Sequence, residues 1–229
     1  HRIWKVEDGG EIEKIRLEFE KIKQMYVADG HHRCSTSALL HKSHNTNQLQ
    51  LDFSHLLCAF MSFDQLVIHD YNRVVNVLDD ISPLTLMSEI SRYCHVKRMI
   101  KPYSPKKKHE KSMFLDREWF RLRWKKGVLD KYKKSEVILD ATVLTDVILK
   151  RILKIKDVRS DRRIKYISGI EGSEGFVEAC LKKRTNVGFG LYPVAKEEFK
   201  TLSDIGEMLP PKSTWFEPRM KNGLIAQEF

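Results

Sequence analysis

The chain has 229 residues, enough for one large domain or two small ones. Hydrophobic residues make up 41% of it, with 11 Phe, 4 Trp and 7 Tyr, so it can bury a core and is not a disordered protein. The formal net charge of +10 favours an anionic partner, such as nucleic acid, a nucleotide or a membrane surface. The longest apolar run, at about 56–61, is far too short to cross a bilayer, which argues against a membrane-spanning protein.

The four cysteines stand far apart and include no C-x-x-C pair. This pattern is typical of neither a disulfide framework nor a zinc ribbon, and no secretory signal is recognisable, so we expect a cytoplasmic protein. Residues 1–6 read as a strand already in progress, without an initiator Met. We therefore expect an N-terminal portion of the protein to lie outside this chain.

In the first hundred residues, short apolar runs predict strands at 3–6, 25–28, 56–62, 65–69 and 95–100. Apolar residues spaced three and four apart predict a helix over 10–24, with Asp8 as its cap. Ser82-Pro83 is a typical helix start and predicts a helix to about Tyr93. The remaining polar segments, 41–52 and 70–73, are interpreted as a loop and an interruption between strands.

In the second half, a hairpin is expected from 113–116 and 119–124. Further strands are expected at 163–167 and 187–194, and helices at 173–183 and at 196–208. Asp140 can cap another helix, whose inward face is expected to carry Leu144, Val147, Ile148 and Ile152. Helices and strands alternate irregularly, with hairpin-like pairs. This order favours an α+β fold, a mixed sheet with flanking helices, over a doubly wound parallel sheet.

Pro102 to Lys111 contains two prolines and a lysine run, and is the best candidate for an internal linker or loop. We therefore expect an α+β part over 1–101 and a second α+β part over 112–229, packed on the first.

The most informative motif is Asp29-Gly30-His31-His32-Arg33, a turn between an expected strand and a helix expected at 34–40. Gly30 permits a left-handed backbone and the close approach of an anion. Arg33 can hold phosphate oxygens with two N–H groups, and His31 and His32 add donors. Asp29 is suited to holding Mg²⁺ or acting as a base, and with His32 it is our candidate catalytic pair. The structural alternative is an Asp-Gly turn whose polar residues cap a helix.

A second candidate is Lys212-Ser213-Thr214, inside the proline-rich segment 209–218. The prolines restrict the backbone, so these three anion-binding side chains are presented with little conformational freedom. The segment is no P-loop, because a glycine-rich lead-in is absent. The alternative is a rigid loop in which Trp215 and the following phenylalanine fill a core.

Three weaker signals remain. Asn72-Arg73 follows an expected strand, but an arginine there can simply pair with a carboxylate. The basic stretch 97–134 is either a solvated face or a nucleic-acid surface, with little of the aromatic interleaving that single-strand binders use. A zinc site is the third signal, although the spacing of its candidate ligands matches no known zinc pattern. Those ligands are His31, His32, Cys34, His41, His44 and His55.

Two motifs together, ADGHHR at 28–33 and PPKSTWFEP at 210–218, resemble a bacterial domain-of-unknown-function family. Segments 1–6, 70–75 and 161–169 share the resemblance. Members of that family look longer, with an N-terminal His-Glu pair, which implies that part of a site lies outside this chain. The DGHHR turn also resembles the phosphate-contacting turn of the ParB/sulfiredoxin-like superfamily, particularly its free serine kinases. That likeness implies nucleotide phosphates held at 29–33 and a glutamate base elsewhere.

The leading hypothesis is nucleotide-dependent phosphoryl transfer to a small hydroxyl compound such as serine, with ATP or ADP and Mg²⁺. In it, Lys212 reaches the transferred group and Ser213 and Thr214 help to bind the nucleotide. The alternative is a non-catalytic, ParB-like nucleotide- or nucleic-acid-binding protein that uses 97–134. A relative that binds a metabolite without turnover is the third possibility.

Overall fold

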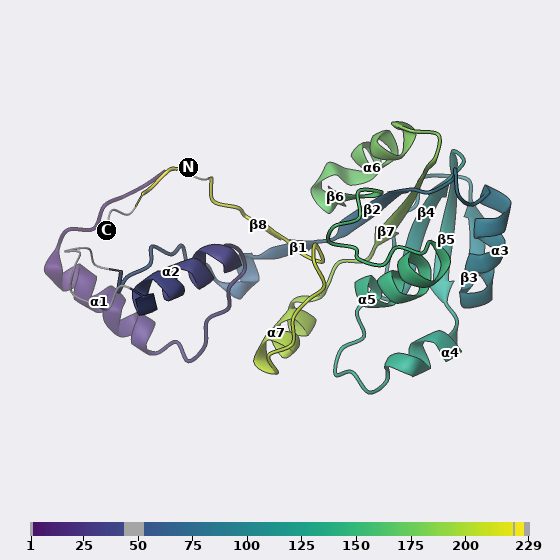
Figure 1. Ribbon diagram of the computed structural model, residues 1–229. Helices are drawn as coiled ribbons and strands as arrows, with labels where there is room; N and C mark the ends of the chain where they lie inside the picture. Colours follow the sequence, from purple (N-terminus) through teal and green to yellow (C-terminus); the bar gives the residue numbers. More distant parts are fainter. Residues whose placement is uncertain (1, 44–52, 222, 227–229) are drawn as a thin grey trace. The chain divides into compact units, whose positions relative to one another are not determined.

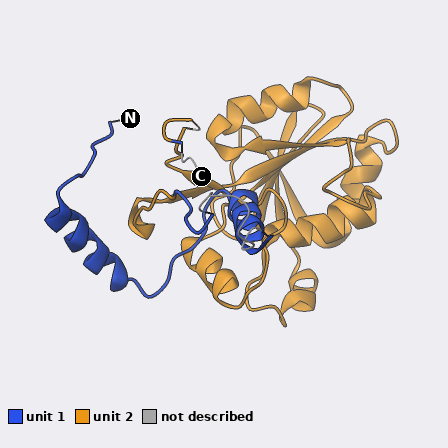
Figure 2. Cartoon of the chain, turned by 60° about the vertical axis from the view of Figure 1, so that its left-hand side comes forward, with its two compact units in different colours: residues 1–57, 226–229 blue, residues 58–225 orange. Residues whose placement is uncertain are grey.

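The computed structural model describes residues 2–43, 53–221 and 223–226. The chain forms two compact units, one of residues 1–57 and 226–229 and the other of residues 58–225 (Figure 2). Among the described residues no helix is both long and apolar enough to cross a membrane. Of the loop predicted over 41–52, residues 41–43 are helical and 44–52 lie outside the described residues.

The first unit is built from two helices, α1 (Gly9–Glu20) and α2 (His31–Ser43), neither of which has a buried residue. Asp8 caps α1 as predicted, because its carboxylate accepts a hydrogen bond of 2.9 Å from the Glu11 N–H. The strands predicted at 3–6 and 25–28 are wrong: neither segment pairs with another strand in the described chain, and Trp4 is 75% exposed. An apolar run becomes a strand only when a neighbouring strand takes its backbone hydrogen bonds.

The second unit contains a six-stranded sheet in the order β3-β5-β4-β7-β2-β6, in which every neighbouring pair is antiparallel (Figure 1). With helices on both faces, this sheet confirms the predicted α+β class. The strands are β2 (Tyr71–Asn76), β3 (Cys94–Met99), β4 (Glu110–Leu115), β5 (Glu118–Trp124), β6 (Ile164–Ser168) and β7 (Asn186–Leu191).

Hydrophobic cores cover both faces of this sheet, because side chains alternate along each strand. Val75 packs into the larger core, on the face covered by α3 (Pro83–Tyr93), α5 (Asp140–Leu144) and the π-helix that continues α5 (Thr145–Ile152). Its neighbour Val74 packs on the opposite face, against α6 (Gly172–Leu181). Residues of α5 and the π-helix that were predicted to face inward are indeed buried or packed on this core.

The start of α3 shows why sequence signals placed it correctly. Ser82 accepts a hydrogen bond of 3.1 Å from the Thr85 N–H, and Pro83 occupies the first turn. Proline is tolerated there because its missing N–H would have no partner inside the helix. The cap of α5 differs from the prediction: Leu139 precedes the helix, and Asp140 is its first residue.

A separate two-stranded sheet joins distant segments, since β1 (Val67–His69) pairs with β8 (Trp215–Glu217) in antiparallel register. The strand predicted at 56–62 is wrong, because the chain there is irregular up to a 3₁₀ turn at Phe63–Gln65. The polar interruption predicted at 70–73 is also wrong, because most of it lies within the buried strand β2. The remaining helices are α4 (Lys126–Leu129), α7 (Lys196–Asp204) and the 3₁₀ turns Asp130–Tyr132 and Gly169–Glu171.

Residues 102–111 connect β3 to β4 and enter the sheet at Glu110. Tyr103 within this segment is buried, and its hydroxyl donates a 2.7 Å hydrogen bond to the Glu110 carboxylate. The sheet takes β2 and β3 from before this segment and β4 to β7 from after it, so it runs across the predicted boundary. The two compact units instead separate after Leu57.

Candidate functional site

The DGHHR turn forms the N-terminus of α2. Gly30 has a φ of +80°, the left-handed conformation that its residue type predicts. The helix begins at His31, three residues before the predicted start, and its first bond runs from the Cys34 N–H to the Gly30 carbonyl at 2.9 Å. His31, His32 and Arg33 therefore make up the first helical turn, where backbone N–H groups have no acceptor within the helix. Such an N-terminus attracts anions.

The guanidinium of Arg33 lies over Gly30. A Cβ added to Gly30 would come within 3.2 Å of the Arg33 Nε and Nη2 atoms. Arg33 also faces Asp29, with 3.7 Å between Nη2 and Oδ2. The Arg33 side chain is 68% exposed and that of Asp29 is 47% exposed, so their attraction is screened and weak. An anion from solvent can therefore reach this guanidinium, and His31 and His32 are exposed beside it.

The predicted Lys212-Ser213-Thr214 group lies in the second unit, immediately before β8. Lys212 has a φ of +53°, which is unusual for a residue with a side chain. The buried Ser213 hydroxyl donates a 2.7 Å hydrogen bond to the Pro210 carbonyl and so fixes the loop. Phe216 is buried against Phe199, as the core-filling alternative predicts. That the turn and this loop act in one site remains a prediction, because they belong to different units.

Arg73, the third candidate, is buried on β2 and is 2% exposed. Within the described chain it has no carboxylate at ion-pair distance, so the simple pairing considered from the sequence is wrong for those residues. Its guanidinium donates to the carbonyls of Tyr71 and Lys212, the latter at 3.2 Å, and lies 5.5 Å from the Tyr166 ring centroid. Burial lowers the pKa of Arg73 to about 10.

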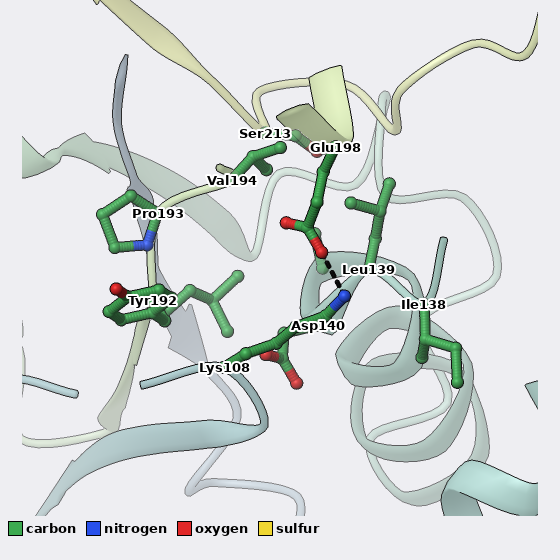
Figure 3. A pocket seen from close by; sticks show the side chains of 11 residues that line it. Lys108, Ile138, Leu139, Asp140, Tyr192, Pro193, Val194, Glu198 and Ser213 are labelled. Atoms are coloured by element: carbon green, nitrogen blue, oxygen red, sulfur yellow. Dashed lines mark hydrogen bonds and ion pairs between the residues drawn. The ribbon is translucent and has the colours of Figure 1, made fainter. Parts of the chain in front are cut away.

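A pocket in the second unit brings Lys108, Asp140, Glu198 and Ser213 together with apolar side chains (Figure 3). Lys108 and Glu198, which both line the pocket, form an ion pair. Asp140 accepts hydrogen bonds from the His109 N–H at 2.6 Å and from the Trp124 indole N–H at 2.9 Å. The carboxylates of Asp140 and Glu198 therefore already have partners, so neither is a free acid or base in this pocket. Sequence reasoning placed Asp140 only as a helix cap.

Despite its burial, Asp140 has a lowered pKa, because the hydrogen bonds from His109 and the charge of Lys111 favour its ionised form. Lys111 is fully buried on β4, and its ammonium is the one buried side-chain polar atom without a hydrogen-bond partner among the described residues. The Nζ atom lies 3.5 Å from the Trp124 ring centroid. Burial lowers the pKa of Lys111 to about 8. No sequence signal distinguishes this lysine from its exposed neighbours.

In the described part of the chain, no three His, Cys, Asp or Glu side chains are placed to hold a metal ion. This finding counts against the zinc alternative for His31, His32, Cys34, His41 and His55, while His44 lies outside the described residues. A Mg²⁺ ion on Asp29 remains a prediction.

The basic stretch 97–134 is not a uniformly free surface. Arg123 pairs with the buried Glu110 at 2.7 Å, and the Lys111 side chain is buried. Further pairs within or from the stretch are Arg98–Glu118, Lys108–Glu198 and Lys133–Asp130. The charge available to nucleic acid is therefore smaller than the composition implies.

A comparison with curated proteins found no match. Among solved structures, a free serine kinase mutant in complex with AMP is 16% identical, with a TM-score of 0.41, over 83% of this chain and 66% of that chain. Another free serine kinase mutant, in complex with ADP, is 17% identical, with a TM-score of 0.40 and the same coverage. This chain therefore spans about two thirds of the length of those kinases. SbnI with a C-terminal truncation, from Staphylococcus aureus, is 14% identical, with a TM-score of 0.46, over 95% of this chain and 80% of that chain.

The sequence model of one family, described as protein of unknown function (DUF1015), matches residues 1–148. The matched region is more than half of the chain and includes the DGHHR turn. It confirms the membership in a domain-of-unknown-function family that the motifs predict: the chain belongs to the DUF1015 family.

Proposed function

We propose that the N-terminus of α2 binds the phosphates of a nucleotide, for phosphoryl transfer from ATP or ADP to a small hydroxyl compound. The observation that carries the proposal is the left-handed Gly30, which leads into a helix whose first turn is His31, His32 and Arg33. The N–H groups of that turn, the helix dipole and the guanidinium all favour a negative charge at the same place. The resemblance of this turn to that of free serine kinases supports the choice of a nucleotide phosphate.

The weak pair of Asp29 and Arg33 suits such a site. Phosphate oxygens offer Arg33 a bidentate partner that is stronger than a screened carboxylate 3.7 Å away. Asp29 is proposed to hold Mg²⁺ or to accept the proton of the substrate hydroxyl. His32 is the second candidate for moving that proton, and His31 adds a donor to phosphate.

Isothermal titration of the chain with ATP and ADP, each with Mg²⁺, tests the binding. AMP is included as a ligand without a β-phosphate. Arg33→Ala is expected to weaken ADP binding at least about 10-fold, as the loss of a charge-assisted hydrogen bond does. Lys42→Ala removes a positive charge from the last turn of the same helix and is expected to leave the affinity almost unchanged. Equal affinity of the Arg33→Ala variant and the unchanged chain would refute the phosphate role of the turn.

Phosphoryl transfer is tested separately, by ³¹P NMR of the chain with nucleotide, Mg²⁺ and serine. Appearance of a phosphate monoester signal is the expected result. Nucleotide binding without any such signal would support the non-catalytic binding alternative instead.

A further inference from the structure

The second unit contains a buried positive charge, Arg73, that forms no ion pair with the described residues. The Arg73 guanidinium is buried, and it donates to two backbone carbonyls and faces a tyrosine ring instead of an acid. A guanidinium has five N–H donors, so these two carbonyls leave part of its capacity for another acceptor. Buried charges in proteins are normally paired, because an unpaired one loses its hydration without compensation.

Asp70 compensates this charge only in part. Its carboxyl attracts Arg73 through space, but the two form no ion pair among the described residues. Burial also raises the pKa of Asp70, so this carboxyl gives up its charge more readily than an exposed one. Its backbone carbonyl is engaged as well, accepting a 2.8 Å hydrogen bond from the Gly169 N–H.

The loop that covers Arg73 brings a second cation. The Lys212 carbonyl accepts from Arg73 Nη2, and the Lys212 ammonium lies 5.6 Å from the Tyr71 ring centroid, with no acid paired to it in the described chain. Lys212 adopts the left-handed backbone at a φ of +53°, and such conformations persist where the surroundings enforce them, often at binding sites. Ser213 holds the turn by its bond to Pro210, and the partly exposed Thr214 follows.

We propose that Arg73 and the loop 210–214 form an oxyanion site that takes a phosphate group. In this site, Lys212 and the Thr214 hydroxyl contact the phosphate oxygens. Arg73 holds the loop through the Lys212 carbonyl and supplies the buried positive charge. The site lies wholly within residues 58–225, so it does not depend on phosphate binding at α2.

Titration with inorganic phosphate tests the site, in the Arg33→Ala background so that the α2 turn contributes little. Lys212→Met in that background is expected to weaken phosphate binding about 10-fold, and Thr214→Val by a smaller factor. Lys200→Met, at an exposed lysine of α7, removes the same charge and is expected to change the affinity less than twofold. The Arg73→Lys variant keeps the positive charge but loses the planar guanidinium with its several N–H donors. It is expected to weaken phosphate binding more than Lys200→Met and less than Lys212→Met.

The outcomes separate this inference from the function proposed for α2. Phosphate binding that survives Arg33→Ala and falls with Lys212→Met supports the loop site, whatever happens at α2. Phosphate binding that disappears with Arg33→Ala alone overturns the loop site and leaves the α2 proposal standing. An equal loss in the Lys212→Met and Lys200→Met variants overturns it too, because the effect is then one of net charge. Circular dichroism melting checks that each variant is folded. If the Arg73→Lys variant does not fold, the phosphate affinities of the Lys212→Met and Thr214→Val variants alone test the loop site.

Discussion

Replacing Lys111 with methionine is expected to stabilise the protein at neutral pH. The ammonium is fully buried without a hydrogen-bond partner, and burial lowers its pKa from the ordinary 10.5 to about 8. That difference corresponds to roughly 3 kcal/mol against the folded state when the lysine is charged. Methionine has a similar shape and no charge to bury. It loses the cation–π contact with the Trp124 ring, worth about 1–2 kcal/mol, so a net gain of roughly 1–2 kcal/mol is expected at pH 7.

The gain should depend on pH in a defined direction. Because the pKa of Lys111 is lower in the folded state, the unfolded chain binds more protons between pH 8 and 10.5. Stability of the unchanged protein therefore rises across that range as the penalty is relieved. Burial raises the pKa of the neighbouring Cys94 thiol to about 11, which works in the opposite direction above pH 9. The difference between protein and variant is for this reason the quantity to follow.

Urea unfolding at pH 7, 8 and 9 measures this difference, with Lys200→Met as the control at an exposed lysine. The advantage of Lys111→Met should be largest at pH 7 and shrink as the pH rises above 8. The reasoning would be refuted if Lys111→Met were less stable than the unchanged protein at pH 7, or if the stability difference did not change with pH. Either result would mean that burying the Lys111 ammonium does not destabilise the folded protein.

Two further substitutions probe packing and capping in the second unit. Gly188→Ala is expected to destabilise the protein by about 1–3 kcal/mol, because a Cβ there would lie 2.4 Å from the Cys180 sulfur. Gly127→Ala is the control, because the space around Gly127 is open. Equal melting temperatures for the two variants would contradict the close approach at Gly188. Ser82→Ala is expected to cost about 1 kcal/mol in urea unfolding by removing the acceptor of the Thr85 N–H, whereas an unchanged midpoint would mean that water replaces the cap.

Local signals were sufficient where an element is specified by its own residues. The Ser82-Pro83 start placed α3, and the two short segments 113–116 and 119–124 placed the β4–β5 hairpin, whose strands are neighbours in sequence. They failed where an element depends on distant partners. Asn72 and Arg73 read as a polar interruption, yet they lie in β2, where the Asn72 amide oxygen accepts a 3.1 Å hydrogen bond from the Leu191 N–H, 119 residues away.

The candidate sites divide in the same way. Gly30 and the polar residues after it predict a left-handed turn at a helix start, because both properties are local. The environments of Arg73 and Lys111 are not local. Arg73 contacts Tyr166 and Lys212, and Lys111 lies near Trp124, Cys94 and Asp140. Whether a lysine or arginine is buried cannot be judged from its own neighbours along the chain.

The position of β2 in the sheet has a consequence for the order of folding. β3, β4 and β5 follow one another along the chain, and they can pair in the order β3-β5-β4 as soon as residues 94–124 have emerged from the ribosome. β2 precedes them, yet it pairs only with β6 and β7, about 90 to 115 residues later. During synthesis, β2 therefore has no partner strand until nearly the whole unit has left the ribosome. An expression boundary at residue 148, where the family match ends, would remove β7, the strand that joins β2 to β4. Such a truncated chain is expected to aggregate through the unpaired edges of β2 and β4.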